Sequence, residues 1–138
     1  MKIMAIDYGD ARTGVAFSDL TGSIVGSTTV VHTRKEERLL EELERLVREN
    51  EVGEVVMGFP RNMNGSEGPR AELYRAFAEK LSGRLGMEVR LWDERRTTVE
   101  AHQILSAHNY HGKKRKSTVD AVAASLILEG YLAFRKKD

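Results

Sequence analysis

The order of strand-like and helix-like segments constrains this chain more than any single residue does. Three short segments rich in apolar and β-branched residues come first, at 2–8, 13–18 and 23–31, with short turns between them. Short connections favour antiparallel neighbours, so we expect these three strands to form a meander. Two later apolar strands, at 54–58 and 88–92, each follow a helical segment. A strand after a helix requires a crossover, which places it parallel to a neighbour.

Helical segments separate and follow the later strands. Leu39, Leu43 and Val47 recur at helical spacing among charged residues, which predicts an amphipathic helix over 35–50. The further predicted helices are 69 to about 82, 97 to about 107, and 117 to about 134. The pattern therefore predicts an α/β fold, with a mixed five-stranded sheet flanked by helices. The 138 residues suit a single domain that spans 1–138.

The composition narrows the classes of protein that fit. The chain has no cysteine, which excludes disulfides, thiolate metal sites and cysteine nucleophiles and agrees with a reducing cytoplasm. No stretch approaches the roughly 20 apolar residues that a membrane span needs, and the first residues do not form a signal peptide. The formal net charge is +1, so contacts with nucleic acid would have to come from local basic patches.

Asp7 is the first candidate for chemistry. It stands at the end of an apolar strand and precedes Gly9-Asp10, which predicts a turn. A carboxylate there is costly to bury unless it is paired, hydrogen-bonded or bound to a metal. The alternative is that Asp7 accepts backbone hydrogen bonds within the turn. Its position in the sequence leaves both interpretations open.

Two further acidic positions could join it. Asp93 and Glu94 end the last strand, and ligands of such sheets collect at the carboxyl ends of strands. Solvated ion pairs at the surface are the alternative there. Asp120 precedes an almost wholly apolar run, so it enters a packed surface. Its alternative is a helix-dipole role, since Asp120 would be the third helical residue if Ser117 were the N-cap.

Together, these acidic residues suggest a metal site more strongly than any one of them does alone. Carboxylates that converge from separate elements repel one another unless a cation joins them. Ligands that supply only oxygen suit Mg2+ or Mn2+. Two such ions about 4 Å apart can activate a water and stabilise the leaving oxygen in phosphodiester hydrolysis. We therefore expect a metal-dependent nuclease if Asp7, Glu94 and Asp120 meet, with Asp93 as the other candidate beside Glu94.

A basic stretch suggests the partner. The segment 108–117 holds four basic residues and no acid, and we expect a loop there: Lys113, Lys114, Arg115 and Lys116. Lys and Arg contact nucleic-acid phosphates in this way, although a solvated loop is the alternative. Arg12, Arg61 and Arg95 are further candidates for phosphate contacts, with Arg96. His32 is expected at the surface.

Four motifs in order along the chain resemble the YqgF/RuvX family. They are 7–16 (DYGDARTGVA), 58–65 (GFPRNMNG), 93–98 (DERRTT) and 116–124 (KSTVDAVAA). The resemblance implies an RNase H-like fold and a bacterial cytoplasmic nuclease. Two roles are attached to that family: maturing the 5′ end of pre-16S ribosomal RNA and resolving Holliday junctions.

The resemblance also implies residue roles. The acidic site maps onto Asp7, the Asp93-Glu94 pair and Asp120, and Asn64 joins the nucleic-acid contacts. Strand alternation puts Asp93 and Glu94 on opposite faces, and Glu94 is the preferred ligand. The related RuvC resolvases carry a further acid shortly after the last aspartate, where this chain has Ala123 and Ala124. That difference leaves fewer metal ligands.

The sequence leaves several alternatives open. Pre-rRNA and branched DNA are both possible substrates, and the chain could be a monomer or a homodimer. A non-catalytic RNA-binding factor for ribosome assembly is a competing function. A phosphotransferase is a weaker one, because related kinases need a second lobe to enclose ATP and 138 residues leave no room for it.

Overall fold

The computed structural model describes residues 1–60, 67–93 and 112–136, with 112–118 and 136 described by their backbone alone. Five strands and three helices lie in these segments. They are β1 (Lys2–Asp7), β2 (Arg12–Ser18), β3 (Val25–His32), α1 (Glu36–Glu49), β4 (Val52–Phe59), α2 (Ala71–Leu85), β5 (Val89–Asp93) and α4 (Gly112–Lys136).

The strands form one mixed sheet in the order β3-β2-β1-β4-β5. β1, β2 and β3 pair antiparallel, while β4 pairs parallel to both β1 and β5. This confirms the predicted meander and the predicted parallel half. The parallel pairs follow from the chain order, because α1 and α2 carry the chain back across the sheet before β4 and β5.

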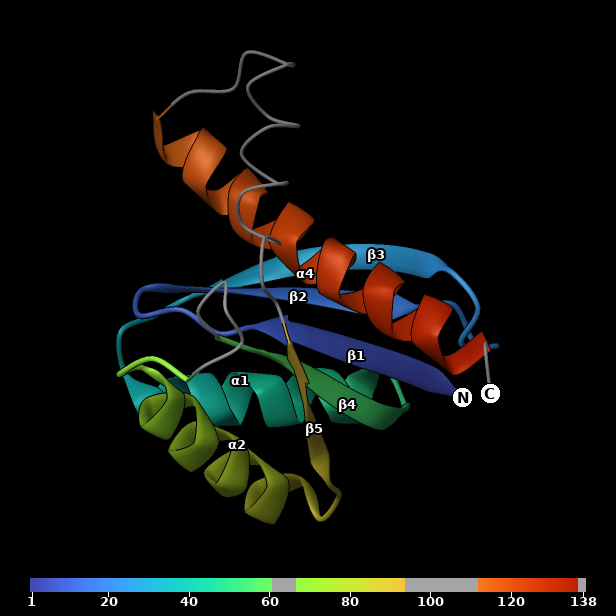
Figure 1. Ribbon diagram of the computed structural model, residues 1–138, viewed down its shortest axis with the longest axis horizontal. Coiled ribbons are helices and arrows are strands. Elements are labelled where there is room, and N and C mark those ends of the chain that lie inside the picture. Colours follow the sequence, from blue (N-terminus) through green and yellow to red (C-terminus); the bar gives the residue numbers. More distant parts are fainter. Residues whose placement is uncertain (61–66, 94–111, 137–138) are drawn as a thin grey trace.

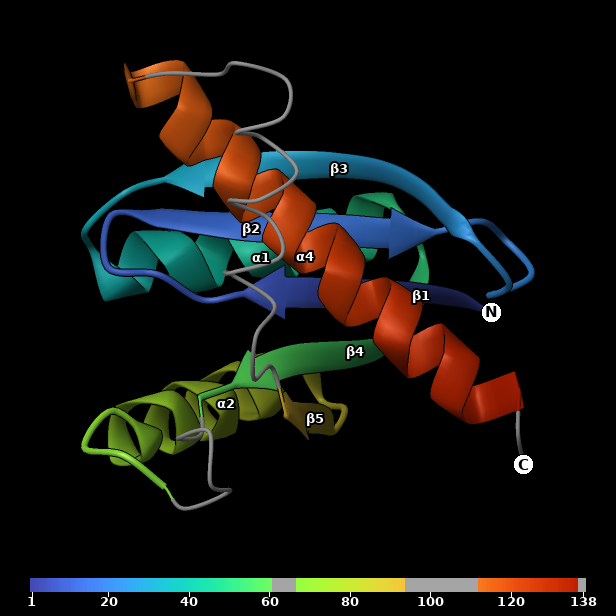
Figure 2. The same ribbon diagram turned by 45° about the horizontal axis from the view of Figure 1, so that its top comes forward.

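Helices cover both faces of the sheet. α4 crosses one face obliquely, and α1 and α2 lie on the other (Figures 1 and 2). Successive side chains of β1 point to opposite faces of the sheet. Met4 and Ile6 belong to the core beneath α1 and α2, whereas Ile3 and Ala5 pack with the apolar residues of α4. Each side chain of β1 can therefore be assigned to a face.

The last helix begins earlier than the sequence predicts. α4 starts at Gly112, so the backbone of 113–116 is helical and the predicted basic loop is wrong for those residues. Lys and Arg are good helix formers, so this stretch can be helical without any apolar periodicity. Ser117 lies inside α4 and is not its N-cap. Asp120 is consequently well beyond the first turn, and the helix-dipole interpretation of it is wrong.

Other expectations fall on residues outside the described segments. The predicted helix over 97–107 is one of them. Most of the predicted polar loop at 61–68 is another. Arg61, Asn64, Glu94 and Arg95 also lie outside the described residues.

Candidate active site

Asp7 faces the helix that carries Asp120. It is the last residue of β1, it is partly buried, and its Cα pairs with that of Gly14 in β2. Ile3 and Ala5 point toward α4, so alternation along β1 places Asp7 on the same face. The first strand therefore presents its terminal carboxylate to the α4 side of the sheet.

Gly14 lets α4 approach this point. A Cβ at Gly14 would lie 2.1 Å from the carbonyl oxygen of Asp120 and 3.3 Å from its Cα. No side chain fits at such a distance, so glycine is required for this backbone contact. Paired Cα atoms of antiparallel strands are about 5 Å apart, so the backbones of Asp7 and Asp120 lie on the order of 10 Å apart. Two of the predicted acids thus lie on the same face, on either side of one glycine.

Arg12 binds the second of these acids. It lies two residues before Gly14 in β2 and shares its face, and its Nε donates a hydrogen bond of 3.0 Å to Oδ2 of Asp120. Burial raises the pKa of the Asp120 carboxyl, while the charge and hydrogen bond of Arg12 and the charge of His32 act in the opposite direction. The shift remains upward. A cation beside Asp120 would therefore relieve part of the cost of burying its charge.

The turn after Asp7 is anchored from the opposite face. The ring of Tyr8 stacks on Phe77 with centroids 4.2 Å apart and meets Tyr74 edge-on. The Tyr74 hydroxyl donates a 2.9 Å hydrogen bond to the carbonyl of Tyr8, and Gly9 N–H points to Oγ1 of Thr13 at 3.4 Å. Because Tyr8 is fixed beneath the sheet, the preceding Asp7 is fixed above it.

The structure does not bring Asp93 to this group. Trp92 packs beneath α4, where its ring meets Tyr131 edge-on, so the next residue, Asp93, points to the other face. Asp93 is exposed at the end of β5, opposite Phe59, whose side chain belongs to the core beneath α2. Asp7 and Asp120 therefore share a face that Asp93 does not.

The described residues form an incomplete metal site. Within 1–60, 67–93 and 112–136, no three His, Asp or Glu side chains gather closely enough to hold an ion. Asp7 and Asp120 supply oxygen donors of the kind that Mg2+ and Mn2+ prefer. The donor chemistry fits such an ion, and completing the site requires ligands beyond this pair.

The basic stretch begins α4 rather than forming a loop beside it. In both views of the fold, the first turns of α4 continue past the β3 edge of the sheet (Figures 1 and 2). The backbone of Lys113, Lys114, Arg115 and Lys116 is in this extension, about one to two turns before Asp120. The residues predicted to contact phosphates are thereby placed on the same element as a predicted metal ligand.

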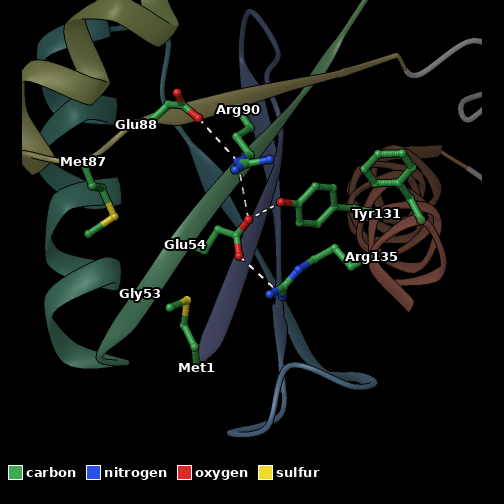
Figure 3. Close-up of a pocket in the computed structure, with 9 residues that line it drawn as sticks. Met1, Gly53, Glu54, Met87, Glu88, Arg90, Tyr131 and Arg135 are labelled. Carbon is green, nitrogen blue, oxygen red and sulfur yellow. Dashed lines mark hydrogen bonds and ion pairs between the residues drawn. The ribbon is translucent and has the colours of Figure 1, made fainter. Parts of the chain in front are cut away.

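A second charged cluster lies toward the opposite end of the sheet. A pocket of ≈ 570 Å³ opens between the start of β4, β5 and the end of α4, and its centre is Glu54 (Figure 3). Tyr131 donates its hydroxyl to Glu54, and the guanidinium groups of Arg90 and Arg135 lie 3.6 and 3.4 Å from its oxygens. Glu54 is thus surrounded by groups that stabilise its charge.

Two features of the site were not predicted from the sequence. Gly14 belongs to the motif at 7–16, and glycine inside a strand is a known sign of close backbone approach, but the sequence does not identify Asp120 as the contact. His32 is exposed, as expected, yet it pairs in register with Arg12 and its charge acts on Asp120. The sequence does not show the partner in either contact, because β3 and α4 are brought to β2 by the fold.

Comparison with family models decides the membership of the chain. Residues 1–134 match the model described as "RuvX: Holliday junction resolvase". The chain belongs to the RuvX family. This confirms the resemblance seen in the four motifs.

Curated relatives of the family cover the whole chain. A Carboxydothermus hydrogenoformans protein is 43% identical over 138 residues, which is 100% of both chains. A Halothermothrix orenii protein is 45% identical over 137 residues, covering 99% of this chain and 98% of its own. Both carry the name "Putative pre-16S rRNA nuclease".

Solved structures with the same fold extend beyond the family. The RuvC structure of Thermus thermophilus aligns with a TM-score of 0.60 at 14% identity and covers 99% of this chain and 97% of its own. The Fowlpox virus resolvase, solved with Holliday junction DNA, aligns with a TM-score of 0.59 at 13% identity over 98% and 99%. At these identities the likeness shows the fold, which is RNase H-like, as the family resemblance implied.

Proposed function

We propose that this protein is a divalent-metal-dependent nuclease that cleaves phosphodiester bonds in structured nucleic acid. The observation that carries the proposal is the convergence of Asp7 and Asp120 on one face of the sheet across Gly14. Two carboxylates on one partly buried face repel each other, and a divalent cation bound between them would relieve that repulsion. Membership of a family described as resolvases, and relatives named as nucleases, support the same chemistry.

Glu94 is the proposed third ligand. Asp93 points away from Asp7, and side chains alternate along a strand, so the next residue is the better candidate for the α4 face. An ion held by Asp7, Asp120 and Glu94 would supply Lewis-acid activation of water and charge stabilisation at the leaving oxygen. Asp7 and Asp120 would orient that ion, since one is fixed by the Tyr8 anchor and the other by the Gly14 contact.

The favoured substrate is a precursor of 16S ribosomal RNA, cleaved to mature its 5′ end. The support is the name shared by relatives 43% and 45% identical over nearly the whole chain. Four-way DNA is the alternative, favoured by the description of the family model. In both cases Lys113, Lys114, Arg115 and Lys116 would contact phosphates, together with Arg61, Asn64 and Arg95.

The cellular location and the oligomeric state of the protein are also proposals. Within the described residues, no helix combines the length and apolarity that crossing a membrane demands. Pre-rRNA processing would place the protein in the cytoplasm, which agrees with the absence of cysteine. A homodimer would suit a two-fold symmetric junction, whereas a monomer suffices for an RNA end.

One side-by-side cleavage assay tests the function. Purified protein is given a ribosomal RNA precursor fragment and a four-way DNA junction, each with Mn2+ and with EDTA. We expect Mn2+-dependent cleavage of the RNA near its mature 5′ end, and none by Asp7→Asn. Cleavage of the junction alone would establish the alternative substrate. Metal-independent binding without cleavage of either substrate would contradict the nuclease and favour a ribosome-assembly factor.

A further inference from the structure

Arg12 occupies a position inside the candidate metal site. Its Nε lies 3.0 Å from Oδ2 of Asp120, and the exposed fractions of the two side chains are 36% and 19%. Arg12 projects from β2 on the face that also carries Asp7, one alternation step from Gly14. A carboxylate oxygen that a metal could use is thus already bound by a fixed guanidinium.

The charges of the site favour one divalent ion. Asp7 and Asp120 bring two negative charges to this face, and Arg12 brings one positive charge to Asp120. A second divalent ion on the Asp120 side would be repelled by that guanidinium, which cannot lose its proton. The site is therefore already provided with part of the positive charge that two metal ions would supply.

The helix offers no further acid on the sheet-facing side of the next turn. Ala124 is 0% exposed and packs in the layer between α4 and the sheet, and Ala123 is 1% exposed in a small cluster with Val119. An alanine methyl group cannot coordinate an ion. A second ion would have to be held near a cation without a carboxylate from this part of α4.

We propose that Arg12 takes the place of a second metal ion, so that the substrate-free protein binds a single divalent ion. Arg12 is then a positioning residue that supplies fixed positive charge to Asp120. This inference rests on the proposed metal-dependent function. It also separates Arg12 from the phosphate-contacting residues among which the sequence places it.

The two roles of Arg12 predict different measurements. A phosphate contact would weaken nucleic-acid binding when removed and leave metal binding unchanged. A fixed charge within the site repels the ion, so its removal strengthens metal binding in the absence of nucleic acid, by roughly tenfold. Cleavage should still fall, because the charge that Arg12 supplies during the reaction is lost.

Isothermal titration with Mn2+, without nucleic acid, tests this. The proteins are wild type, Arg12→Gln, Arg12→Lys and Arg34→Gln; Arg34 is a control whose side chain is 74% exposed and pairs with Asp10 in a neighbouring loop. We expect one Mn2+ per wild-type chain. Arg12→Gln should bind Mn2+ more tightly, while Arg12→Lys and Arg34→Gln stay near wild type. Circular dichroism confirms that each variant folds.

The outcomes separate this inference from the proposed function. Two Mn2+ ions per wild-type chain would overturn the role of Arg12 and leave a metal-dependent nuclease intact. Unchanged or weaker Mn2+ binding by Arg12→Gln would also overturn it, since Arg12 would then not act on the ion as a fixed charge. A wild-type chain that binds no Mn2+ would overturn the proposed function as well.

Discussion

α4 passes over two clusters of charged residues that differ in how their carboxylates are stabilised. Toward one end of the sheet, Glu54 accepts a hydrogen bond from Tyr131 and lies between Arg90 and Arg135. Toward the other end, Asp7 and Asp120 share a face with Arg12, which binds Asp120. Both clusters are partly buried, and both join the sheet to the same helix.

The difference between them supports the proposed placement of the active site at the Asp7 end. Glu54 has two positive groups and a hydroxyl around it, so its charge is stabilised by the protein itself. At the Asp7 end, two carboxylates share one face of the sheet, and Arg12 pairs with one of them, Asp120. A divalent ion is held by carboxylates that gather on one partly buried face, and the Asp7 end offers two of them there. We therefore propose that the Glu54 cluster stabilises the fold and that the Asp7 cluster is the active site.

The largest expected effect is the loss of cleavage in Asp7→Asn. Asp7→Asn removes one carboxylate charge from the proposed ion and should lower the cleavage rate more than about 100-fold. Mutating residues that only hydrogen-bond to metal ligands already lowers metal affinity or activity roughly 10–100-fold. Melting temperature should change little. Asp10→Asn is the matched control, since Asp10 lies in the adjacent turn with its side chain 90% exposed. If both variants lost cleavage activity equally, Asp7 would have no specific role in the site.

Gly14→Ala should separate the two acids without removing either. The added methyl group would collide with the backbone of Asp120 at 2.1 Å, so α4 must shift. We expect at least tenfold slower cleavage and a destabilisation of about 1–3 kcal/mol, measured by urea unfolding.

Gly26→Ala is the control for this change. Gly26 lies in β3, and a Cβ there would meet its nearest atom, the carbonyl oxygen of Ser18, at 3.4 Å, which is ordinary contact. That variant should cleave like wild type. Wild-type cleavage by Gly14→Ala would show that the Asp120 backbone contact does not set the site.

Glu54→Ala should do the reverse of Asp7→Asn. It leaves the buried Tyr131 hydroxyl without its acceptor and removes the carboxylate that pairs with Arg90 and Arg135, so the free energy of unfolding should fall by about 1–3 kcal/mol. Cleavage at a temperature where the variant is folded should match wild type. If cleavage were abolished with unfolding unchanged, the assignment of the two clusters would be reversed.

The smallest effect concerns Asp120 in metal-free protein. Burial raises its pKa in the folded state above the ordinary 3.8, against the opposing effects of Arg12 and His32. Its favourable contribution is then present below pH 3.8 and is lost as pH rises through the folded pKa. Asp120→Asn should therefore be slightly more stable than wild type at neutral pH in EDTA, and the difference should disappear in acid. A less stable variant at neutral pH would contradict this.

The fold could be predicted largely because its determinants are local. Apolar runs, turn residues and helical periodicity gave the strands of the meander, and crossovers gave the parallel half. The start of α4 could not be predicted, because Lys113 to Lys116 carry no apolar period and favour a helix by backbone propensity alone. Because α4 begins at Gly112, Asp120 is not the first-turn residue that a start at Ser117 would make it.

The site was predictable as separate residues but not as an arrangement. The sequence shows Asp7 and Asp120 as acids in apolar surroundings. Their placement on one face depends on Gly14 and on a helix more than 100 residues later. The placement of His32 depends on the β2–β3 register, which shifts between Phe17 and Ser18. Asp19 fixes the turn there, where hydrogen bonds from Thr21 and Ser23 lower its pKa to about 2. No local pattern reveals such a shift.

A crystal of the protein soaked in Mn2+ tests the central claim most directly, because anomalous scattering locates the ion without any assay of activity. We predict an anomalous peak coordinated by carboxylate oxygens of Asp7 and Asp120, and none at Glu54. Crystals of Asp7→Asn should lack the peak. A peak at the Glu54 cluster, or an Asp7→Asn crystal that keeps the ion, would contradict the division of the molecule into a structural end and a chemical end.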